Sequence, residues 1–366
     1  MKTQTRRHFL RTMSRAFPAL GLAPFLTQIS VRAVEAQTQP AATHEGELNV
    51  ALVPNNWANY GQVVQAFSER HGIQVTQIDV QGNAANALNA IQKGPVVPDV
   101  IDVNFPFGEQ ARRAGLLQAY RPIGWNKIPA NLKDRAGHWA GSHFGVLAFE
   151  VNTEVVPDPP QDWADLLKPE FTASFALAGD PRSEPLAINS VFAAALANGG
   201  SLRNAGPGLA FFERLNALGR LQPAIAKPEL VASGATPVTF RWDYNALHNR
   251  DQHRNKIKVI VPRRGVLARV FVQGITAKAA HPVAAKLWMD YLFSDEGQQL
   301  LMQGYARSVW FGDLTRRKVL PVELLDRLPP ATAYARVAYP TITQSSAAQK
   351  VITEGWDRVV GVNVGA

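Results

Sequence analysis

Short apolar runs alternate with amphipathic segments in the first third of this 366-residue sequence, and this alternation restricts its fold more than any other feature. Residues 48–53, 73–80 and 100–103 have the composition of buried strands. Each run is followed by a segment with helical spacing of apolar residues, at 60–70, 84–93 and 109–114. Strands joined by single helices pair in parallel through right-handed crossovers. The sequence therefore predicts an α/β fold that begins with a parallel sheet.

The alternation continues beyond residue 144 and predicts a second α/β lobe. Residues 144–152 form an apolar run long enough to pass between lobes, and residues 268–272 form a run that returns the chain to the first lobe. Further strands are expected at 175–178, 238–242 and 257–261, and a helix at 186–197. We therefore expect lobe 1 at 47–143 plus 267–310, lobe 2 at 144–266, and a C-terminal helical segment at 311–366.

The N-terminal segment has the three parts of an export signal. Arg6 and Arg7 precede Phe9-Leu10-Arg11, an apolar stretch covers 16–26, and a small-residue cleavage site lies at 34–36. The paired arginines resemble the twin-arginine signal, and the apolar stretch is too short to span a bilayer. The alternative is a basic arm for nucleic acid or lipid, which would not need the apolar stretch. We therefore expect residues 1–36 to be a signal peptide read by the twin-arginine translocase, and the mature protein to lie in the periplasm.

The positive charge of the chain is concentrated in this expected signal. The sequence has 38 Lys and Arg against 29 Asp and Glu, a net charge of +9 that is typical of nucleic-acid binders. Six basic residues and one acidic residue lie within 1–36, so 32 basic and 28 acidic residues follow. The mature chain is therefore not expected to bind nucleic acid.

Several classes of chemistry are excluded by what the sequence lacks. It has no cysteine, which excludes disulfides, thiolate metal sites, iron–sulfur clusters and cysteine nucleophiles. It also lacks the Gly-x-Ser-x-Gly elbow, a phosphate-binding Gly-Lys-Ser/Thr loop and the His-Glu-x-x-His motif. We therefore expect a chain without a cofactor or resident metal that is not an enzyme.

Five sequence segments together resemble one protein family. The helical segment 281–298 resembles the C-terminal signature of the extracellular solute-binding proteins of ABC importers, in the subgroup that binds ferric iron, polyamines, thiamine and phosphonates. Segments 99–103, 114–117, 151–153 and 163–167, the last followed by Pro169, occur in the order of that family. The resemblance covers roughly residues 47–310 of the sequence.

The resemblance implies a type II periplasmic binding fold, with two α/β lobes, a hinge and a ligand cleft between the lobes. Each lobe would supply half of the site, so that a bound solute favours the closed form. A membrane permease with its ATPase subunit would then take a small charged solute from the closed protein. The protein is expected to be monomeric.

One group of candidate ligand contacts follows the strand at 238–242. Trp242, Asp243 and Tyr244 lie where iron-binding relatives carry adjacent tyrosines, and only one tyrosine is present here. In one interpretation Trp242 stacks on the ligand while Asp243 and Tyr244 form hydrogen bonds or accept a cation. In the other, Trp242 belongs to the core and Asp243 caps the following helix.

The other candidates also follow strands, because ligands in such sheets bind beyond the carboxyl ends of the strands. Arg182 and Ser183 precede a helix whose free N–H groups can bind an anion, although a plain capping turn explains them equally well. The remaining candidates are Asn55, Asn56, Trp57, Asn83, Phe105, Phe107 and Glu184.

The charge of the ligand stays open at this point. Asp243 and Glu184 favour a cation, Arg182 and Arg241 favour an anion, and a zwitterion would use both. A ferric site would have few anionic oxygens here, so a ferric-iron-binding protein is the second hypothesis. The third is a ligand-loaded periplasmic sensor that docks on a membrane receptor kinase. No histidine pair forms a metal-binding motif, and the ligand-binding hypothesis therefore includes no metal.

Overall fold

The computed structural model describes residues 45–51, 57–78, 80, 84–253 and 256–365. The expected signal peptide and the candidates Asn55, Asn56 and Asn83 lie outside these residues. Among the described residues, no helix is both long enough and apolar enough to cross a membrane.

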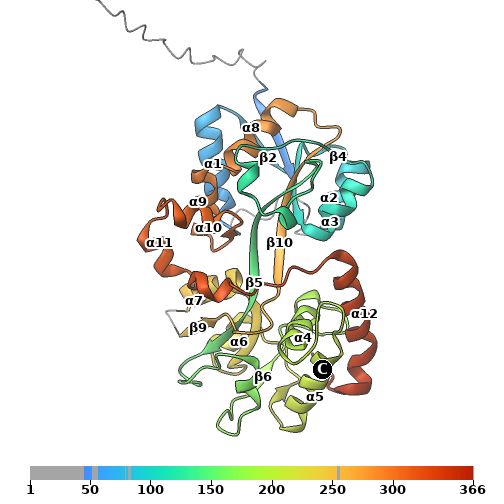
Figure 1. The fold of residues 1–366 in the computed structure, drawn as a ribbon, viewed down its shortest axis with the longest axis vertical. Helices are drawn as coiled ribbons and strands as arrows, with labels where there is room; N and C mark the ends of the chain where they lie inside the picture. Colours follow the sequence, from blue (N-terminus) through green and yellow to red (C-terminus); the bar gives the residue numbers. More distant parts are fainter. Residues whose placement is uncertain (1–44, 52–56, 79, 81–83, 254–255, 366) are drawn as a thin grey trace, which may run out of the picture. The chain divides into compact units, whose positions relative to one another are not determined.

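The described residues form one mixed β-sheet covered by helices (Figure 1). The strands are β1 Glu47–Ala51, β2 Gln74–Gln77, β3 Val100–Asn104, β4 Leu117–Gln118, β5 Ala140–Asn152, β6 Phe175–Ala176, β7 Leu221–Gln222, β8 Val238–Trp242, β9 Ile257–Ile260, β10 Ala268–Thr276 and β11 Arg307–Ser308. The helices are α1 Tyr60–His71, α2 Ala84–Lys93, α3 Phe105–Arg113, α4 Pro185–Ala197, α5 Gly206–Ala217, α6 Pro228–Ala232, α7 Asp243–Gln252, α8 Pro282–Leu292, α9 Asp295–Gln303, α10 Phe311–Arg316, α11 Val322–Arg327 and α12 Ile342–Val359, with 3-10 turns η1 Trp125–Lys127, η2 Ala130–Leu132, η3 Trp163–Leu167 and η4 Ala331–Tyr334.

The sheet consists of two halves that share one strand. In the first half-sheet, β1 pairs in parallel with β2 and β3, as predicted, and β10 pairs antiparallel with β3 and β5. In the second half-sheet, β5 pairs antiparallel with β8 and β9, and β8 pairs in parallel with β6. The 13-residue β5 is buried along its whole length and belongs to both halves. The predicted α/β class is confirmed.

Helix α3 begins four residues before the position predicted for it. The helix was predicted at 109–114, after Pro106 and Gly108, but α3 starts at Phe105 directly after β3. Proline fits the first helical turn, because its missing N–H would have no partner there. A Cβ on Gly108 would lie 2.3 Å from Val272 Cγ2, so this glycine lets α3 pack closely on β10. The packing requirement explains why glycine is tolerated inside the helix.

Interlocked aromatic rings hold the second half-sheet against its helices. Trp163 is fully buried, and its ring centroid lies 4.3 Å from Phe240 and 5.4 Å from Phe211. Phe149 on β5 contacts Phe240 on β8 at 4.7 Å. Such ring pairs add stabilisation beyond the area they bury. The ring contact between Phe149 and Phe240 therefore reinforces the pairing of β5 with β8.

The C-terminal segment contacts both half-sheets. β11 pairs with β5 at Phe144 and His143, and a bridge then joins Ala338 to Leu267 immediately before β10. Helix α12 packs against α4 and α5, which is visible beside the marked C-terminus (Figure 1). Residues after β11 are therefore part of the packed structure and not a loose extension.

A buried ion pair links β5 to β8. Glu150 is fully buried, accepts a hydrogen bond from the Arg241 guanidinium, and accepts a second from Asn249 Nδ2 at 2.9 Å. Arg241 also donates to the carbonyl oxygen of Ala226 at 2.7 Å. Arg241 is therefore neutralised in the core, which corrects the expectation that its charge attracts an anionic ligand.

We expect Glu150→Ala to destabilise the protein by about 3–5 kcal/mol, because it leaves the Arg241 charge buried without its partner. Urea unfolding followed by circular dichroism measures this change. The control is Glu154→Ala, which removes an exposed ion pair with Lys256 and should cost less than about 1 kcal/mol. Equal effects of the two substitutions would contradict the assignment of Glu150 as a core anchor.

Candidate ligand-binding site

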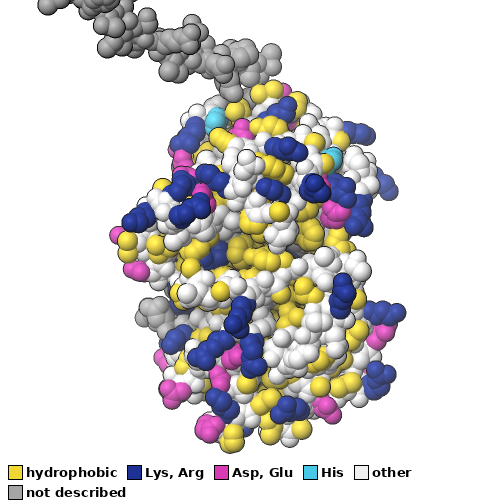
Figure 2. Space-filling model, in the orientation of Figure 1, with side chains coloured by type: hydrophobic (Ala, Val, Ile, Leu, Met, Phe, Trp, Pro, Cys, Tyr) yellow, Lys and Arg dark blue, Asp and Glu magenta, His cyan; other side chains and the backbone are white. Residues whose placement is uncertain are grey.

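A cleft with a volume of about 800 Å³ lies where elements of both half-sheets meet. Figure 2 shows a hollow containing hydrophobic side chains at mid-height of one face. The lining comes mainly from the starts of helices and the ends of strands: Asn104, Phe105, Pro106, Phe107, Asn131, Leu132, Trp139, Glu184, Pro185, Leu186, Asn189, Trp242, Asn245, Ala268, Arg269, Val270, Tyr339, Pro340, Thr341, Ile342, Ser345, Ser346 and Gln349.

The chain path explains why these residues converge. β3 passes directly into α3 and β8 passes directly into α7, so the carboxyl end of each strand meets the first turn of a helix. Ligand sites in α/β sheets lie at this edge. α4 and α12 also present their first turns to the cleft. The N–H groups at these four helix starts give this region a partial positive charge.

Aromatic side chains form much of the wall. Phe105 and Trp139 make an edge-to-face contact with ring centroids 5.2 Å apart. Phe105 and Phe107 are half-buried, and Trp242 is 4% exposed. Phe105, Phe107 and Trp242 thus line the cleft, as anticipated for ligand contacts, and Tyr339 completes the aromatic set. Aromatic walls combined with polar side chains are typical of sites for organic ligands.

Two charged side chains line the cleft, Arg269 and Glu184. Within the described part of the chain, neither of them has an ion-pair partner. The Arg269 guanidinium lies over the Phe271 ring at 5.2 Å from its centroid. Glu184 is exposed and precedes α4 without forming a capping hydrogen bond. The cleft therefore offers one cation and one anion to a ligand.

Arg182 and Ser183 face away from this cleft. Arg182 pairs with Asp180 at 2.8 Å and donates to Asn363 Oδ1 at 2.6 Å. Its guanidinium therefore connects the loop before α4 to the C-terminal end of the chain and is not among the lining groups. Ser183 is exposed and does not line the cleft either. Of the 182–184 candidates, only Glu184 reaches it.

Asp243 and Tyr244 lie behind the wall and not in it. Asp243 is 1% exposed and accepts hydrogen bonds from Val146 N at 3.0 Å and Tyr334 Oη at 2.5 Å. It also accepts from Tyr244 N, so its carboxylate is used in holding the start of α7. Burial raises the pKa of Asp243 to about 6. Asp243 is thus neither a cleft contact nor the cap residue of α7, because the helix begins at Asp243 itself and Trp242 is its N-cap residue; the carboxylate instead connects β5 to Tyr334.

Trp57 belongs to a buried aromatic cluster beside the cleft. Its ring lies 4.7 Å from Phe271, 5.3 Å from His143 and 5.2 Å from Tyr244. Trp242 stacks on Tyr244 at 6.4 Å, which connects this cluster to the cleft wall. Trp57 itself is half-buried and is not among the lining residues.

The sequence reading missed several lining groups. Arg269 lies within a predicted strand, where a charged residue between apolar neighbours indicates a functional position. Asn189 and Asn245 occupy the first turns of α4 and α7. The start of α12 had a local signal that the analysis of the sequence missed, because Thr341 and Gln344 form a capping box directly after Pro340.

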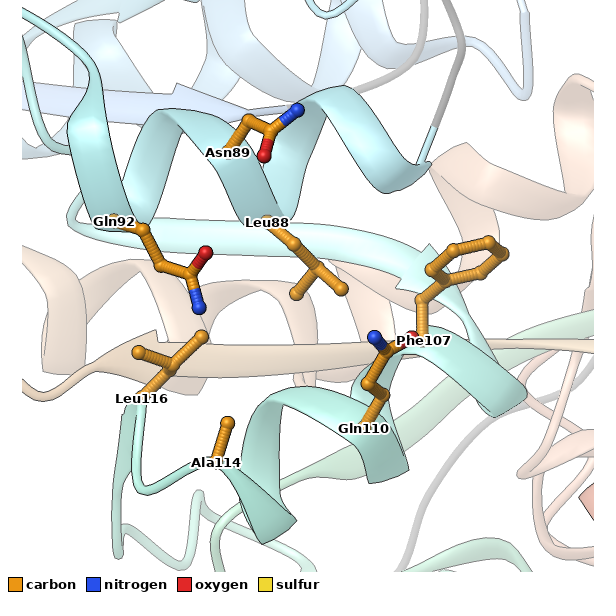
Figure 3. Close-up of a pocket in the computed structure, with 7 residues that line it drawn as sticks. All are labelled: Leu88, Asn89, Gln92, Phe107, Gln110, Ala114 and Leu116. Atoms are coloured by element: carbon orange, nitrogen blue, oxygen red, sulfur yellow. The ribbon is translucent and has the colours of Figure 1, made fainter.

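A second cavity of about 170 Å³ lies between α2 and α3 (Figure 3). Gln92 on α2 and Gln110 on α3 project into it, and Phe107 closes one end. Phe107 also lines the large cleft, so one side chain separates the two cavities.

A metal site is not found among the described residues. They contain no cluster of three or more His, Asp or Glu side chains that could hold an ion.

A buried polar chain lies under the first half-sheet. Tyr60 Oη donates to Asp102, and Gln273 Nε2 donates to Tyr60 Oη at 3.1 Å. Ser142 Oγ lies 2.9 Å from His143 Nδ1 in the same region. Burial raises the pKa of Asp102 to about 7 and lowers the pKa of His143 to about 3. The surroundings therefore favour the uncharged form of each of these two side chains.

We expect Asp102→Asn to change how stability depends on pH. The pKa of Asp102 is higher in the folded state, so its contribution is full below about pH 3.9 and is lost as the pH rises to about 7. Relative to wild type, the Asn variant should therefore gain up to about 4 kcal/mol in unfolding free energy between pH 4 and 8.

Urea unfolding at several pH values measures this gain. The exposed Asp326→Asn substitution also removes one carboxylate and is the matched control. Stability curves of wild type and Asp102→Asn that stay parallel from pH 4 to 8 would show that Asp102 is ionised in the folded protein at every pH.

Comparison with known proteins gives a consistent result. The family model of bacterial extracellular solute-binding proteins matches residues 96–330. A protein of Sinorhizobium fredii, named as a probable periplasmic-binding protein of an ABC transporter, is 26% identical over 61% of this chain and 60% of its own length. An ABC transporter substrate-binding protein from Bradyrhizobium japonicum is 15% identical with a TM-score of 0.67, covering 86% of this chain and 99% of that one. Iron-bound HitA from Pseudomonas aeruginosa is 16% identical with a TM-score of 0.58, covering 84% and 99%.

Proposed function

This chain belongs to the bacterial extracellular solute-binding proteins of ABC transporters, and we propose that it captures a small charged organic solute in the cleft for delivery to a membrane permease. The observation that carries this proposal is the cleft itself: about 800 Å³, lined from both half-sheets, with one guanidinium and one carboxylate that lack ion-pair partners among the described residues. The family consists of transport proteins, so the chain is not an enzyme.

The proposed mechanism is closure around the ligand. Phe105 and Phe107 contact the ligand from α3, while Trp242 and Glu184 contact it from elements that adjoin the second half-sheet. A ligand that touches both sides stabilises the closed form by its differential affinity. β5, β10 and the bridge at Ala338 connect the two sides and would carry the hinge motion. Asp243 and Tyr244 position this wall from behind.

A ferric ligand is supported less well. Ferric iron requires several anionic oxygens, and the lining residues described here include one carboxylate, Glu184, and one phenol, Tyr339. Asp243 and Tyr244, the other candidate ligands, are buried behind the wall. HitA binds iron, but at 16% identity its likeness concerns the fold alone. Ferric iron is therefore included as a test compound.

The proposal includes the partners that the family implies. The protein would be exported through the twin-arginine translocase, release its signal peptide, and act as a monomer in the periplasm with an ABC permease and its ATPase subunit. Docking on a membrane receptor kinase is the alternative use of the same loaded form. Uptake of the bound solute by cells that lack the permease genes distinguishes the two roles. Uptake is lost if the protein serves the importer, and it is unchanged if the protein serves only the receptor kinase.

A thermal-shift screen of the purified protein tests the proposed function. The compounds are ferric ion with citrate, polyamines, thiamine, phosphonates and organic carboxylates. A ligand at a hundred times its dissociation constant should add about 2.7 kcal/mol to the unfolding free energy. Ser345→Trp, which fills the cleft from α12, should abolish this gain.

The matched control lies on the same helix. Lys350 is exposed and does not line the cleft, so Lys350→Trp should keep the full ligand-induced shift. A shift that survives in Ser345→Trp would place the ligand elsewhere on the protein. Absence of a shift with every compound class would contradict the proposed function.

A further inference from the structure

We propose that the solute is an organic monocarboxylate with an apolar body, and that Arg269 binds its carboxylate. This inference rests on the proposed function and names the substrate class of the same cleft. It is carried by the position of Arg269, by the neutralisation of the other arginines nearby, and by the composition of the cleft wall.

Arg269 is held in a position suited to pairing with a ligand anion. It lies on β10 opposite Gly145 of β5, where the partner strand has no side chain. Its guanidinium is half-buried over Phe271, and Tyr244 packs on the same ring. Guanidinium and carboxylate form paired, charge-assisted hydrogen bonds. Partial burial makes such a pair stronger than one at an exposed surface.

The other arginines in this region already have partners. Arg241 pairs with Glu150, and Arg182 pairs with Asp180. Arg307 lies between the rings of Phe311 and Tyr334 and donates to the carbonyl oxygen of Pro329. Arg269 is thus the one cationic side chain among the described lining residues. One cation matches a monoanion better than a phosphate dianion.

The wall of the cleft fits an apolar body beside this charge. Five aromatic side chains line it, from Phe105, Phe107, Trp139, Trp242 and Tyr339, and Leu132, Leu186 and Ile342 add aliphatic surface. A hydrated inorganic anion would leave these walls without a partner. Glu184, at the exposed edge, disfavours additional negative charge.

The test uses matched probes on the purified protein. Straight-chain, branched and aromatic monocarboxylates, including 3-phenylpropionate, are compared with their amides and with amines of the same skeleton, by thermal shift and then by titration calorimetry. Carboxylates should bind, whereas the neutral amides should bind at least about tenfold more weakly, because they lack the charge that pairs with Arg269. Polyamines, ferric citrate and sugar phosphates complete the panel.

Arg269→Gln should weaken carboxylate binding at least about tenfold and leave amide binding unchanged. Arg269→Lys keeps the charge and should retain part of the affinity. Arg264→Gln, which removes an exposed arginine paired with Asp162, is the matched control and should bind as wild type does. Thermal unfolding without ligand verifies that each variant is folded.

The outcomes separate this inference from the proposed function. Binding of an amine, ferric citrate or a sugar phosphate with no binding of any carboxylate would overturn the inference and leave the proposed function intact. Carboxylate binding that is unaffected in folded Arg269→Gln would overturn the role of Arg269. Failure of every compound class to bind would overturn both.

Discussion

The antiparallel pairing of β5 with β10 is the interaction on which both half-sheets depend. β10 connects this pair to β3, β1 and β2, while the second half of β5 carries β8 and β9. Gly145 lies near one end of this pairing, and a Cβ there would be 2.3 Å from the Tyr244 ring and 2.7 Å from Asp243 Oδ1. The absence of a side chain therefore lets α7 start directly against β5. The residues around Gly145 therefore support the cleft wall and also belong to the expected hinge.

Electrostatic compensation decides which charges can reach a ligand. From the sequence, Arg241 and Arg182 are candidates for binding an anionic ligand. In the fold, however, each of them is paired with a carboxylate of the protein. Glu150, which neutralises Arg241, is 91 residues away in the chain. Arg269 has no such partner within the described residues and lies at the cleft. The charge available to a ligand is therefore a property of the tertiary structure.

Local pattern predicted the fold well because periodic burial determines strands and helices. Residues 84–93 and 257–260 were placed almost to the residue, and the parallel order of β1, β2 and β3 was anticipated. Strand ends also indicated Phe105, Phe107 and Trp242 as cleft residues. The burial of Asp243 behind the wall could not be predicted, because it depends on Tyr334, which is 91 residues away. The contribution of α12 depends on long-range packing and was not predicted.

The family match ends at residue 330, yet seven cleft-lining residues belong to the segment that follows it. The bridge at Ala338 and the packing of α12 on α4 and α5 fix this tail in place. Substitutions at the start of α12 can alter the wall without disturbing the sheet. Part of the cleft wall is therefore supplied by a segment that lies outside the range matched by the family model.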